Sequence, residues 1–355
     1  MRALIVLDER WNSALTDFGI KVGRMLSCQV GFALLKDKPA HRRLEGKGYP
    51  LFFIEDPRRG LPFKPFLSLK RALSRFNPDV VITIRGDEML FSALLKGRFN
   101  YTLFRIHGSQ RGIKNSFLNR LIHRKFVDGA IISSRRLINP VVEGLKKLII
   151  PGIVDTEEFY YDAEGAAKFK SEIGAQGKKL IGVVGRLDPV KGHSLFLQAL
   201  SRLKGEDYIA VIVGEEKNVK VKELKELAGK LGLLGRVIFI TERREDIRGI
   251  MSACDLAVVP SKGSEVILRA PLEFMACETP VVSTSVGALP EVIKPPFGRA
   301  VPPEAEALSS AIGTFLKRDL KKLGKIAKEV VDEKYSLKAN APAVNSFICG
   351  VQNHR

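Results

Sequence analysis

Short apolar runs rich in β-branched residues alternate with longer amphipathic stretches along the whole chain. The short runs predict buried strands, and the longer stretches predict helices. In the first half, the predicted strands are Ala3–Leu7, Gln29–Leu35, Leu51–Ile54, Val80–Ile84, Tyr101–Ile106, Gly129–Ser133 and Lys147–Ile150. Helical patterns between them include Leu67–Arg75 and Ser116–Phe126. This alternation predicts βαβ units around a mostly parallel sheet.

The stretch 155–179 interrupts the alternation, because it is polar and contains Gly165, Gly174 and Gly177. We expect it to be an interdomain segment. The pattern then restarts, with strands predicted at Leu180–Val184, Ile209–Val213, Val237–Ile240, Leu256–Val259 and Val281–Ser283. Helices are predicted at Ser194–Leu203, Val219–Leu231, Asp246–Ala253, Leu268–Ala276 and Glu304–Lys317. The predicted fold is α/β with two doubly wound domains, residues 1–165 and 175–335, and a C-terminal helix within 336–355.

The composition limits the class of protein. A length of 355 residues agrees with two domains at roughly 150 residues each. Hydrophobic residues make up 45% and charged residues 27%, which excludes disorder for most of the chain. No apolar run is long enough to cross a bilayer, and the apolar start meets Asp8 too early for a signal peptide. The four cysteines form no C-x-x-C pair, so we expect neither disulfides nor structural zinc, and a cytoplasmic location.

The chain is strongly basic, with 58 Lys and Arg against 39 Asp and Glu, a net charge of +19. Residues 101–150 alone carry 10 basic and 2 acidic side chains. Such a field favours anionic partners such as nucleic acid, phosphorylated small molecules or acidic lipid surfaces, and it is equally compatible with a solvated basic surface. We expect no nucleic acid, because a recognisable reading motif and an aromatic stacking platform are both missing.

An apolar strand, a glycine turn and two cations come together in Gly182-Val-Val-Gly185-Arg186-Leu-Asp-Pro-Val-Lys191-Gly192-His193, ahead of a helical pattern. Backbone N–H groups at the start of a helix attract phosphate, and glycine allows close approach. Arg186 can present a planar fork to phosphate oxygens, and Lys191 a mobile charge. The segment alone also fits an ordinary surface turn, since it is neither a Walker motif nor G-x-G-x-x-G.

Two glutamates stand eight positions apart in a second segment, Pro260-Ser-Lys-Gly-Ser-Glu265-Val-Ile-Leu-Arg-Ala-Pro-Leu-Glu273-Phe-Met-Ala. Glu265 lies in a Ser/Gly-rich loop, and Glu273 lies in the first turns of the predicted helix. A carboxylate in such an apolar segment is costly to bury unless it accepts hydrogen bonds, and sugar or ribose hydroxyls are suitable donors. Alternatively, Glu273 is a helix-start carboxylate stabilised by the helix dipole.

Together, these segments resemble the retaining glycosyltransferases of family 4, which have the GT-B fold of two facing Rossmann-like domains. Supporting segments follow in family order: Phe104-Arg-Ile-His107-Gly108, Asp128-Gly-Ala-Ile-Ile-Ser-Ser134, Ile150-Pro-Gly-Ile-Val-Asp155-Thr-Glu-Glu-Phe159, Val213-Gly214, Ala253-Cys-Asp-Leu-Ala-Val-Val-Pro-Ser261 and Val286-Gly-Ala-Leu-Pro-Glu291-Val. The resemblance covers nearly the whole chain, strongly over residues 128–295 and faintly before residue 100.

The resemblance implies roles for individual residues. Contacts to the nucleotide sugar are implied for Gly185, Arg186, Lys191, Glu265, Val266, Ile267, Leu268 and Glu273. Arg186 and Lys191 would hold the donor diphosphate, and Glu273 would bind the nucleotide ribose. Glu265 would face the transferred sugar, beside backbone amides of the loop that follows it. These residues are therefore our candidates for the donor side.

His107 is a further catalytic candidate. A single histidine after a strand is commonly structural, but its position between Arg105 and Gly108 at a strand end favours function. The resemblance implies that it lies across the cleft, beside the transferred sugar and the reacting centre. It also implies that the C-terminal helix crosses back onto the first domain.

The sequence departs from the family pattern in several places. Family members often have a Gly-Gly loop after the first strand, where this chain has Trp11, Asn12 and Ser13. We assign these three residues to the acceptor side. The usual Phe-Gly after the first glutamate is Val266-Ile267, the usual Asn-Gly before Asp155 is Gly152-Ile153, and Glu278 replaces a common glycine. None of these changes removes an assigned catalytic group.

The expected activity is transfer of a sugar from a nucleotide diphosphate sugar to a hydroxyl acceptor, with retention of anomeric configuration. The acceptor would be a glycan, a lipid-linked molecule or a small phosphorylated molecule. We expect no cofactor and no essential metal, since the sequence has no Asp-x-Asp metal signature. Two alternatives are a GT-B epimerase or hydrolase acting on the nucleotide sugar, and a non-catalytic nucleotide-sugar-binding protein.

Residues 112–126 form a basic amphipathic pattern. Apolar residues recur at helical spacing at Ile113, Phe117, Leu118, Leu121, Ile122 and Phe126, with Lys114, Arg120, His123, Arg124 and Lys125 between them. The helix could pack on its own sheet with a solvated basic face. Alternatively, it could dock on an anionic membrane, which predicts peripheral, salt-sensitive association with the inner face of the cell membrane.

Overall fold

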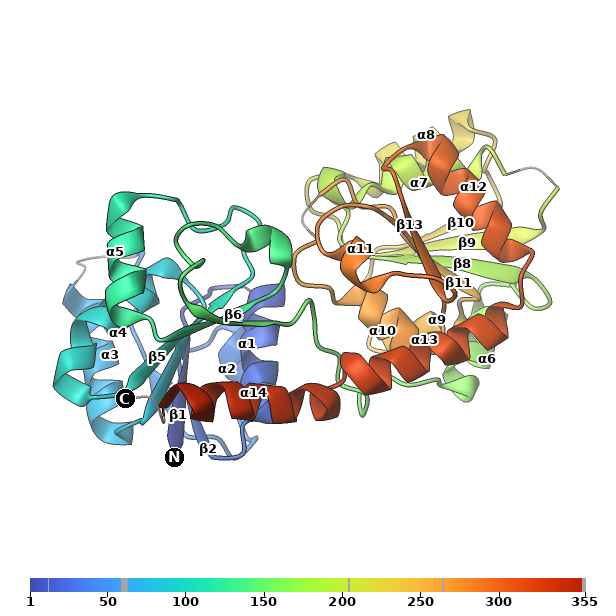
Figure 1. The fold of residues 1–355 in the computed structure, drawn as a ribbon. Coiled ribbons are helices and arrows are strands. Elements are labelled where there is room, and N and C mark those ends of the chain that lie inside the picture. The colour runs from blue at the N-terminus through green and yellow to red at the C-terminus, as the bar shows by residue number, and fades with distance from the viewer. Residues whose placement is uncertain (12, 59–62, 204, 264, 353–355) are drawn as a thin grey trace. The chain divides into compact units, whose positions relative to one another are not determined.

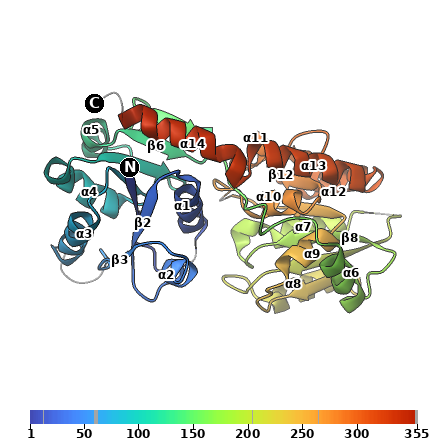
Figure 2. The same cartoon turned by 90° about the horizontal axis from the view of Figure 1, so that it is seen from below.

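The computed structural model describes residues 1–11, 13–58, 63–203, 205–263 and 265–352. The chain forms two compact units. Unit 1 contains Met1–Ile153 and the chain from Leu337 onward, and unit 2 contains Val154–Ser336. Each unit is built on one parallel sheet covered by helices on both faces (Figures 1 and 2).

The sheet of unit 1 has the strand order β3-β2-β1-β4-β5-β6-β7. Its strands are β1 (Arg2–Leu7), β2 (Gln29–Leu34), β3 (Leu51–Phe53), β4 (Val80–Thr83), β5 (Thr102–His107), β6 (Gly129–Ile132) and β7 (Lys146–Ile149). Its helices are α1 (Ala14–Met25), α2 (Pro39–Leu44), α3 (Phe63–Phe76), α4 (Gly86–Phe99), α5 (Phe117–Phe126), the 3₁₀ turn η1 (Arg135–Leu137) and α14 (Leu337–Gln352). The chain changes direction across the sheet between β1 and β4, and such switch points are where doubly wound folds bind ligands.

The sheet of unit 2 has the order β10-β9-β8-β11-β12-β13, with its switch point between β8 and β11. Its strands are β8 (Lys179–Val184), β9 (Tyr208–Val213), β10 (Val237–Ile240), β11 (Leu256–Val259), β12 (Val281–Thr284) and β13 (Gly298–Val301). Its helices are α6 (Ala163–Glu172), the 3₁₀ turn η2 (Pro189–Lys191), α7 (His193–Leu200), α8 (Val221–Lys230), α9 (Ile247–Ala253), α10 (Ala270–Ala276), α11 (Leu289–Val292), α12 (Ala305–Leu316) and α13 (Leu320–Lys334).

The predicted fold class is confirmed. Every strand predicted from the sequence occurs, with ends within one residue of the prediction. The prediction missed β13, whose sequence Gly-Arg-Ala-Val carries only one strongly apolar residue. It also missed α13, an amphipathic helix that packs against α10.

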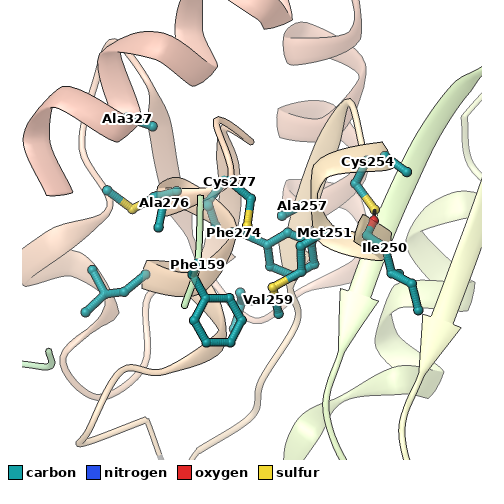
Figure 3. Close-up of a cluster of buried hydrophobic side chains, with 14 of the residues drawn as sticks. Phe159, Ile250, Met251, Cys254, Ala257, Val259, Phe274, Ala276, Cys277 and Ala327 are labelled. Carbon is teal, nitrogen blue, oxygen red and sulfur yellow. Dashed lines mark hydrogen bonds between the residues drawn. The ribbon is translucent and has the colours of Figure 1, made fainter. Parts of the chain in front are cut away.

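Side chains of unit 2 alternate between the two faces of its sheet. In β9, Val211 and Val213 join one buried cluster, while Ala210 and Ile212 join the other. Figure 3 shows part of the first cluster, where Phe274 lies among sulfur-containing and aliphatic side chains. Because both faces are covered, the central strand β11, Leu-Ala-Val-Val, is apolar at every position.

The prediction of an interdomain segment at residues 155–179 was wrong. The boundary between the units falls at Ile153 and Val154, and α6 occupies much of the segment inside unit 2. A Cβ atom on Gly165 would lie 2.9 Å from the Cα of Gly249 in α9, so this glycine permits close helix packing. Sequence polarity alone could not distinguish a surface helix with a packed glycine from a linker.

Candidate donor-binding site

Backbone contacts hold the loops at the carboxyl ends of β8 and β11 together. Gly192 has φ +72°, and a Cβ atom there would lie 1.9 Å from the carbonyl oxygen of Pro260. The N–H of Lys262 donates to the carbonyl oxygen of Val190 at 2.8 Å. Only glycine accommodates both the positive φ and this close approach. The segment from Gly185 to His193 is therefore fixed against the loop that carries Glu265.

Lys191 and Glu265 form an ion pair at this edge of the sheet. Lys191 Nζ lies 2.6 Å from Glu265 Oε1, and the hydroxyl of Ser261 donates to the same oxygen at 2.6 Å. The Glu265 side chain is 5% exposed, and that of Lys191 is 27% exposed. Because Ser261 and Lys191 both contact Oε1, the carboxylate has a fixed orientation. A buried carboxylate with these contacts carries its charge at a defined place.

Glu265 is also fixed from a third loop. Its carbonyl oxygen accepts a hydrogen bond from the N–H of Ala288 at 2.6 Å. A Cβ atom on Gly287, which has φ +57°, would lie 2.0 Å from that same carbonyl oxygen. The loops after β8, β11 and β12 thus converge on one glutamate of unit 2.

The other donor-side candidates lie in the same loops. Arg186 follows β8 and is exposed, and it makes no ion pair with the described residues. Gly185 is half-buried, and its N–H donates to the carbonyl oxygen of Val213 at 2.9 Å, which extends the hydrogen bonding between β8 and β9 by one residue. Arg186 is therefore a cation available to an anion.

Glu273 lies in the first turn of α10, 6% exposed, with Arg269 Nε 3.5 Å from Oε1. Among the described residues, no hydrogen bond or ion pair joins Glu273 to Lys191 or Glu265. The structure therefore brings Lys191 and Glu265 into contact and leaves Glu273 outside that pair.

The loop after Glu265 contains Val266, which is half-buried, and Ile267 and Leu268, which are buried. Leu268 is 0% exposed and belongs to a core cluster of unit 2. Its side chain is therefore part of the core, so a contact from Leu268 to a ligand would have to come from its backbone.

His107 ends β5 in unit 1 and is 2% exposed. Its Nε2 has no hydrogen-bond partner in the described part of the chain. Burial, with the nearby positive charge of Arg105, lowers the pKa of His107 to about 4. His107 is therefore a neutral imidazole at pH 7.

The neighbours of His107 are also buried and cationic or neutral. Arg105 Nη1 lies 2.7 Å from His123 Nε2, and His123 Nδ1 lies 2.7 Å from the carbonyl oxygen of Asn119. Since the carbonyl oxygen only accepts, His123 carries its proton on Nδ1 and accepts at Nε2 from Arg105. Burial lowers the pKa of His123 to about 4.

The acceptor-side candidates lie after β1. Trp11 is 52% exposed, and the Arg58 guanidinium lies 5.6 Å from the centre of its ring. Ser13 caps α1 by accepting from the N–H of Thr16 at 3.0 Å, and it also donates to Glu9. The Ser13 hydroxyl is therefore engaged within unit 1. Asn12 lies outside the described residues.

Sequence reasoning missed two sets of residues at these strand ends. His193 follows Gly192 directly and is 2% exposed, and burial lowers its pKa to about 4. The Lys-Gly-His ending of the first motif was the available signal. In unit 1, burial raises the pKa of Asp8 to about 6, although Arg85 Nε lies 3.3 Å from it.

Residues 166–330 match the model of the family described as Glycosyl transferases group 1. Among curated relatives, D-inositol 3-phosphate glycosyltransferase of Corynebacterium jeikeium is 31% identical over 189 residues, covering 48% of this chain and 45% of the relative. The lipopolysaccharide core biosynthesis mannosyltransferase LpsB of Rhizobium meliloti is 30% identical over 217 residues, covering 59% of this chain and 60% of the relative. The chain thus matches about half the length of these relatives.

Solved structures match over the whole chain. A glycosyltransferase from Rickettsia africae has a TM-score of 0.87 at 19% identity, with 100% of this chain and 99% of that chain covered. Anabaena HepE in complex with UDP and glucose has a TM-score of 0.81 at 19% identity, with both chains fully covered. At this identity the likeness shows the fold. The two Rossmann-like units are therefore those of the GT-B fold. The family match thus falls within unit 2, and the curated relatives named above are glycosyltransferases.

Proposed function

We propose that this protein transfers a sugar from a nucleotide diphosphate sugar to a hydroxyl acceptor, with retention of anomeric configuration. The observation that carries the proposal is the ion pair of Lys191 and Glu265 at the carboxyl ends of β8 and β11, with the exposed cation Arg186 in the same loop. The family match over residues 166–330 supports it, as do the UDP and glucose in the HepE structure.

Departure of the nucleoside diphosphate builds negative charge on the phosphate while the sugar becomes an oxocarbenium-like cation. Cations fixed before the reaction stabilise that developing charge, and we assign this task to Arg186 and Lys191. Glu265 has the matching task of holding sugar hydroxyls, because its carboxylate is oriented by Ser261 and Lys191. We infer that the acceptor attacks from the leaving-group side, with the departing phosphate accepting the acceptor's proton.

We propose that His107 forms a hydrogen bond with a hydroxyl of the transferred sugar. Its pKa, lowered to about 4, keeps it uncharged at pH 7, so it can exchange a hydrogen bond with a hydroxyl without repelling a cationic transition state. Replacing His107 by Gln should retain part of the turnover, and replacing it by Ala should retain less. Equal turnover of His107→Ala and the parent protein would remove this assignment.

We propose that no divalent metal is required. The described residues contain no group of three or more His, Cys, Asp and Glu side chains that could hold a metal ion. The cations Arg186 and Lys191 would supply the positive charge that a metal supplies in other transferases. Turnover should therefore survive EDTA, and its loss with recovery on adding Mg²⁺ or Mn²⁺ would contradict the proposal.

A panel of nucleotide sugars and nucleoside diphosphates, scored by thermal shift, tests donor binding. A ligand at about 100 times its Kd stabilises the folded state by about 2.7 kcal/mol. We expect one nucleotide series to raise the melting temperature of the parent protein and to lose this effect in Lys191→Ala. Lys262→Ala is the matched control, because it removes a lysine from the exposed surface of the neighbouring loop.

Product analysis then distinguishes the proposal from its alternatives. Sustained conversion of the donor without any acceptor would favour an epimerase or hydrolase. Binding without conversion, across a panel of glycan, lipid-linked and phosphorylated acceptors, would favour a binding protein. Transfer that inverts the anomeric configuration would refute retention.

We further propose peripheral association with an anionic membrane through α5. The apolar side chains Phe117, Leu118 and Leu121 are 74%, 62% and 49% exposed, beside the exposed cations Arg120 and Arg124. The contacting helix α4 adds Leu90 and Leu94, which are 39% and 62% exposed. An exposed apolar face bordered by cations suits the interface of an acidic bilayer. None of the described helices is long and apolar enough to cross a membrane.

Co-sedimentation with phosphatidylserine-containing vesicles at low and high salt tests this association. Each basic residue near the surface contributes about 1 kcal/mol, so replacing Arg120, Arg124 and Lys125 by Ser should weaken binding by about 100-fold or more. Absence of binding at low salt, or binding that survives about 1 M salt, would refute the electrostatic version. Unchanged binding of the triple variant would exclude α5.

A further inference from the structure

We propose that the groove between β3 and α3 of unit 1 binds an amphipathic anion, a hydrocarbon chain that ends in a phosphate. The groove is a cavity of about 750 Å³ whose walls come from the edge strand β3 and one face of α3. Figure 2 shows these two elements, which are in contact. The described residues that line it include none of the proposed donor-binding residues, and neither His107 nor any residue of α5. The proposal is therefore independent of sugar transfer.

Part of the groove lining is apolar and comes from Leu51, Phe52, Phe53, Phe63, Leu67 and Ala72. Phe53 and Phe63 are 48% and 52% exposed, and Leu67 is 40% exposed. The ring centres of Phe52 in β3 and Phe76 in α3 lie 5.4 Å apart. Large side chains left this exposed on neighbouring elements mark a ligand or partner surface rather than a solvated one. A volume of this size is typical of small-molecule sites.

The polar part of the lining is cationic. Lys64, Arg71 and Arg75 are exposed along α3 and make no ion pair with other described residues, while the lining holds one carboxylate, that of Glu55. Spacings of seven and four residues place the three cations on one side of the helix. Lys36 adds a fourth cation, 5.9 Å from the centre of the Phe53 ring. Arginine forks suit phosphate oxygens, so the head of the ligand is an anion.

The groove is preorganised by a hydrogen-bonded junction. The N–H of Glu55 donates to Ser68 Oγ at 2.9 Å, and that hydroxyl donates to the carbonyl oxygen of Pro65 at 2.8 Å. These bonds fix the end of β3 against the first turns of α3. The separation of the two walls is therefore set before a ligand arrives.

An extended acidic peptide is the competing occupant, because β3 is an edge strand. However, Pro50 and Ile54 bond to β2, and β3 is only three residues long. Residues in a strand alternate in the direction of their backbone groups, so only Leu51 and Phe53 point theirs away from β2. Two residues give too short a ladder for strand addition, whereas the aromatic walls and the free cations match a chain with a charged head.

Isothermal titration with dodecyl phosphate, below its critical micelle concentration, tests the proposal on the full chain. Inorganic phosphate measures the contribution of the phosphate head group alone, and dodecyl maltoside measures that of the hydrocarbon chain with an uncharged head group. We expect saturable 1:1 binding of dodecyl phosphate, at least 100-fold weaker binding of either control, and an affinity that rises about twofold or more per added methylene. Equal affinity for dodecyl maltoside or for inorganic phosphate would overturn the proposal.

Variants locate the site. Arg71→Glu with Arg75→Glu should weaken dodecyl phosphate at least 10-fold. Lys222→Glu with Lys225→Glu, exposed on α8, makes the same change in net charge and should alter binding less than twofold. Leu67→Ser should weaken dodecyl phosphate and leave inorganic phosphate unchanged. Equal losses in the two charge-reversal pairs, or no loss in the α3 pair, would refute the site, as would binding of an acidic peptide in place of dodecyl phosphate.

Discussion

Replacing Lys191 by alanine removes the cation that links the loops after β8 and β11. Its Nζ lies 2.6 Å from Glu265 Oε1, and the Glu265 side chain is only 5% exposed. In the variant, Ser261 alone still donates to that carboxylate oxygen. The substitution therefore has two separable effects, one on the stability of unit 2 and one on the proposed diphosphate.

The effect on stability follows from burial. Removing one partner of a fully buried ion pair costs about 3–5 kcal/mol, because the other charge is left uncompensated. Lys191 is 27% exposed, so water can replace part of the ammonium, and we expect a loss of about 1–3 kcal/mol. Removing both charges in Lys191→Ala/Glu265→Gln should recover about 1–2 kcal/mol relative to additivity. Chemical denaturation of the four proteins measures this coupling.

The effect on turnover is larger. Losing one preorganised group that stabilises developing negative charge costs about 2–4 kcal/mol, which is about 30- to 1000-fold in turnover. Glu265→Gln keeps an acceptor for Ser261 and leaves Lys191 without its counter-charge. This second variant should therefore bind the nucleoside diphosphate at least as tightly as the parent protein and still lose turnover.

The assay is turnover and nucleoside diphosphate affinity for the parent protein, Lys191→Ala, Glu265→Gln and the control Lys262→Ala. Parent-like turnover and affinity in Lys191→Ala would refute the phosphate role. Equal loss of nucleotide affinity in Lys191→Ala and Glu265→Gln would show that Lys191 acts by orienting Glu265.

Three further outcomes are expected. Gly192→Ala should cost more than about 2 kcal/mol in chemical denaturation, because its Cβ would meet Pro260, whereas Gly232→Ala, with a similar φ but open space, should cost about 1 kcal/mol; equal costs would contradict the close approach. Folding lowers the pKa of His123 from 6.5 to about 4, so the unfolded chain binds this proton first as the pH drops, and His123 reduces the stability from pH 6.5 towards 4 by up to about 1.4 kcal/mol per pH unit. His123→Gln should reduce the slope of stability against pH by up to that amount, while His107 and His193 keep their share, and an unchanged slope would refute the prediction. Phe117→Ser with Leu121→Ser should reduce vesicle binding at high and low salt alike, and no reduction would exclude an apolar contribution from α5.

The candidate site could be predicted only in part. Arg186, Lys191 and Glu265 are marked by their motifs, because glycine turns and charged residues directly after apolar runs are local features. Their association depends on tertiary structure, since Lys191 and Glu265 are 74 residues apart and meet only because β8 and β11 are neighbours in the sheet. Leu268 shows the converse, because a position within the motif is taken up by the core.

The sequence by itself determined the strands of both sheets except β13, and the basic character of α5, because periodicity and composition act over a few residues. Tertiary structure decided which glycines permit close packing, as Gly165 does against α9. It likewise decided which titratable side chains are removed from water, as those of Arg105, His107 and His123 are. It also decided that β3 and α3 enclose a groove. These outcomes depend on which elements pack together, and packing is a property of the whole chain that no local pattern encodes.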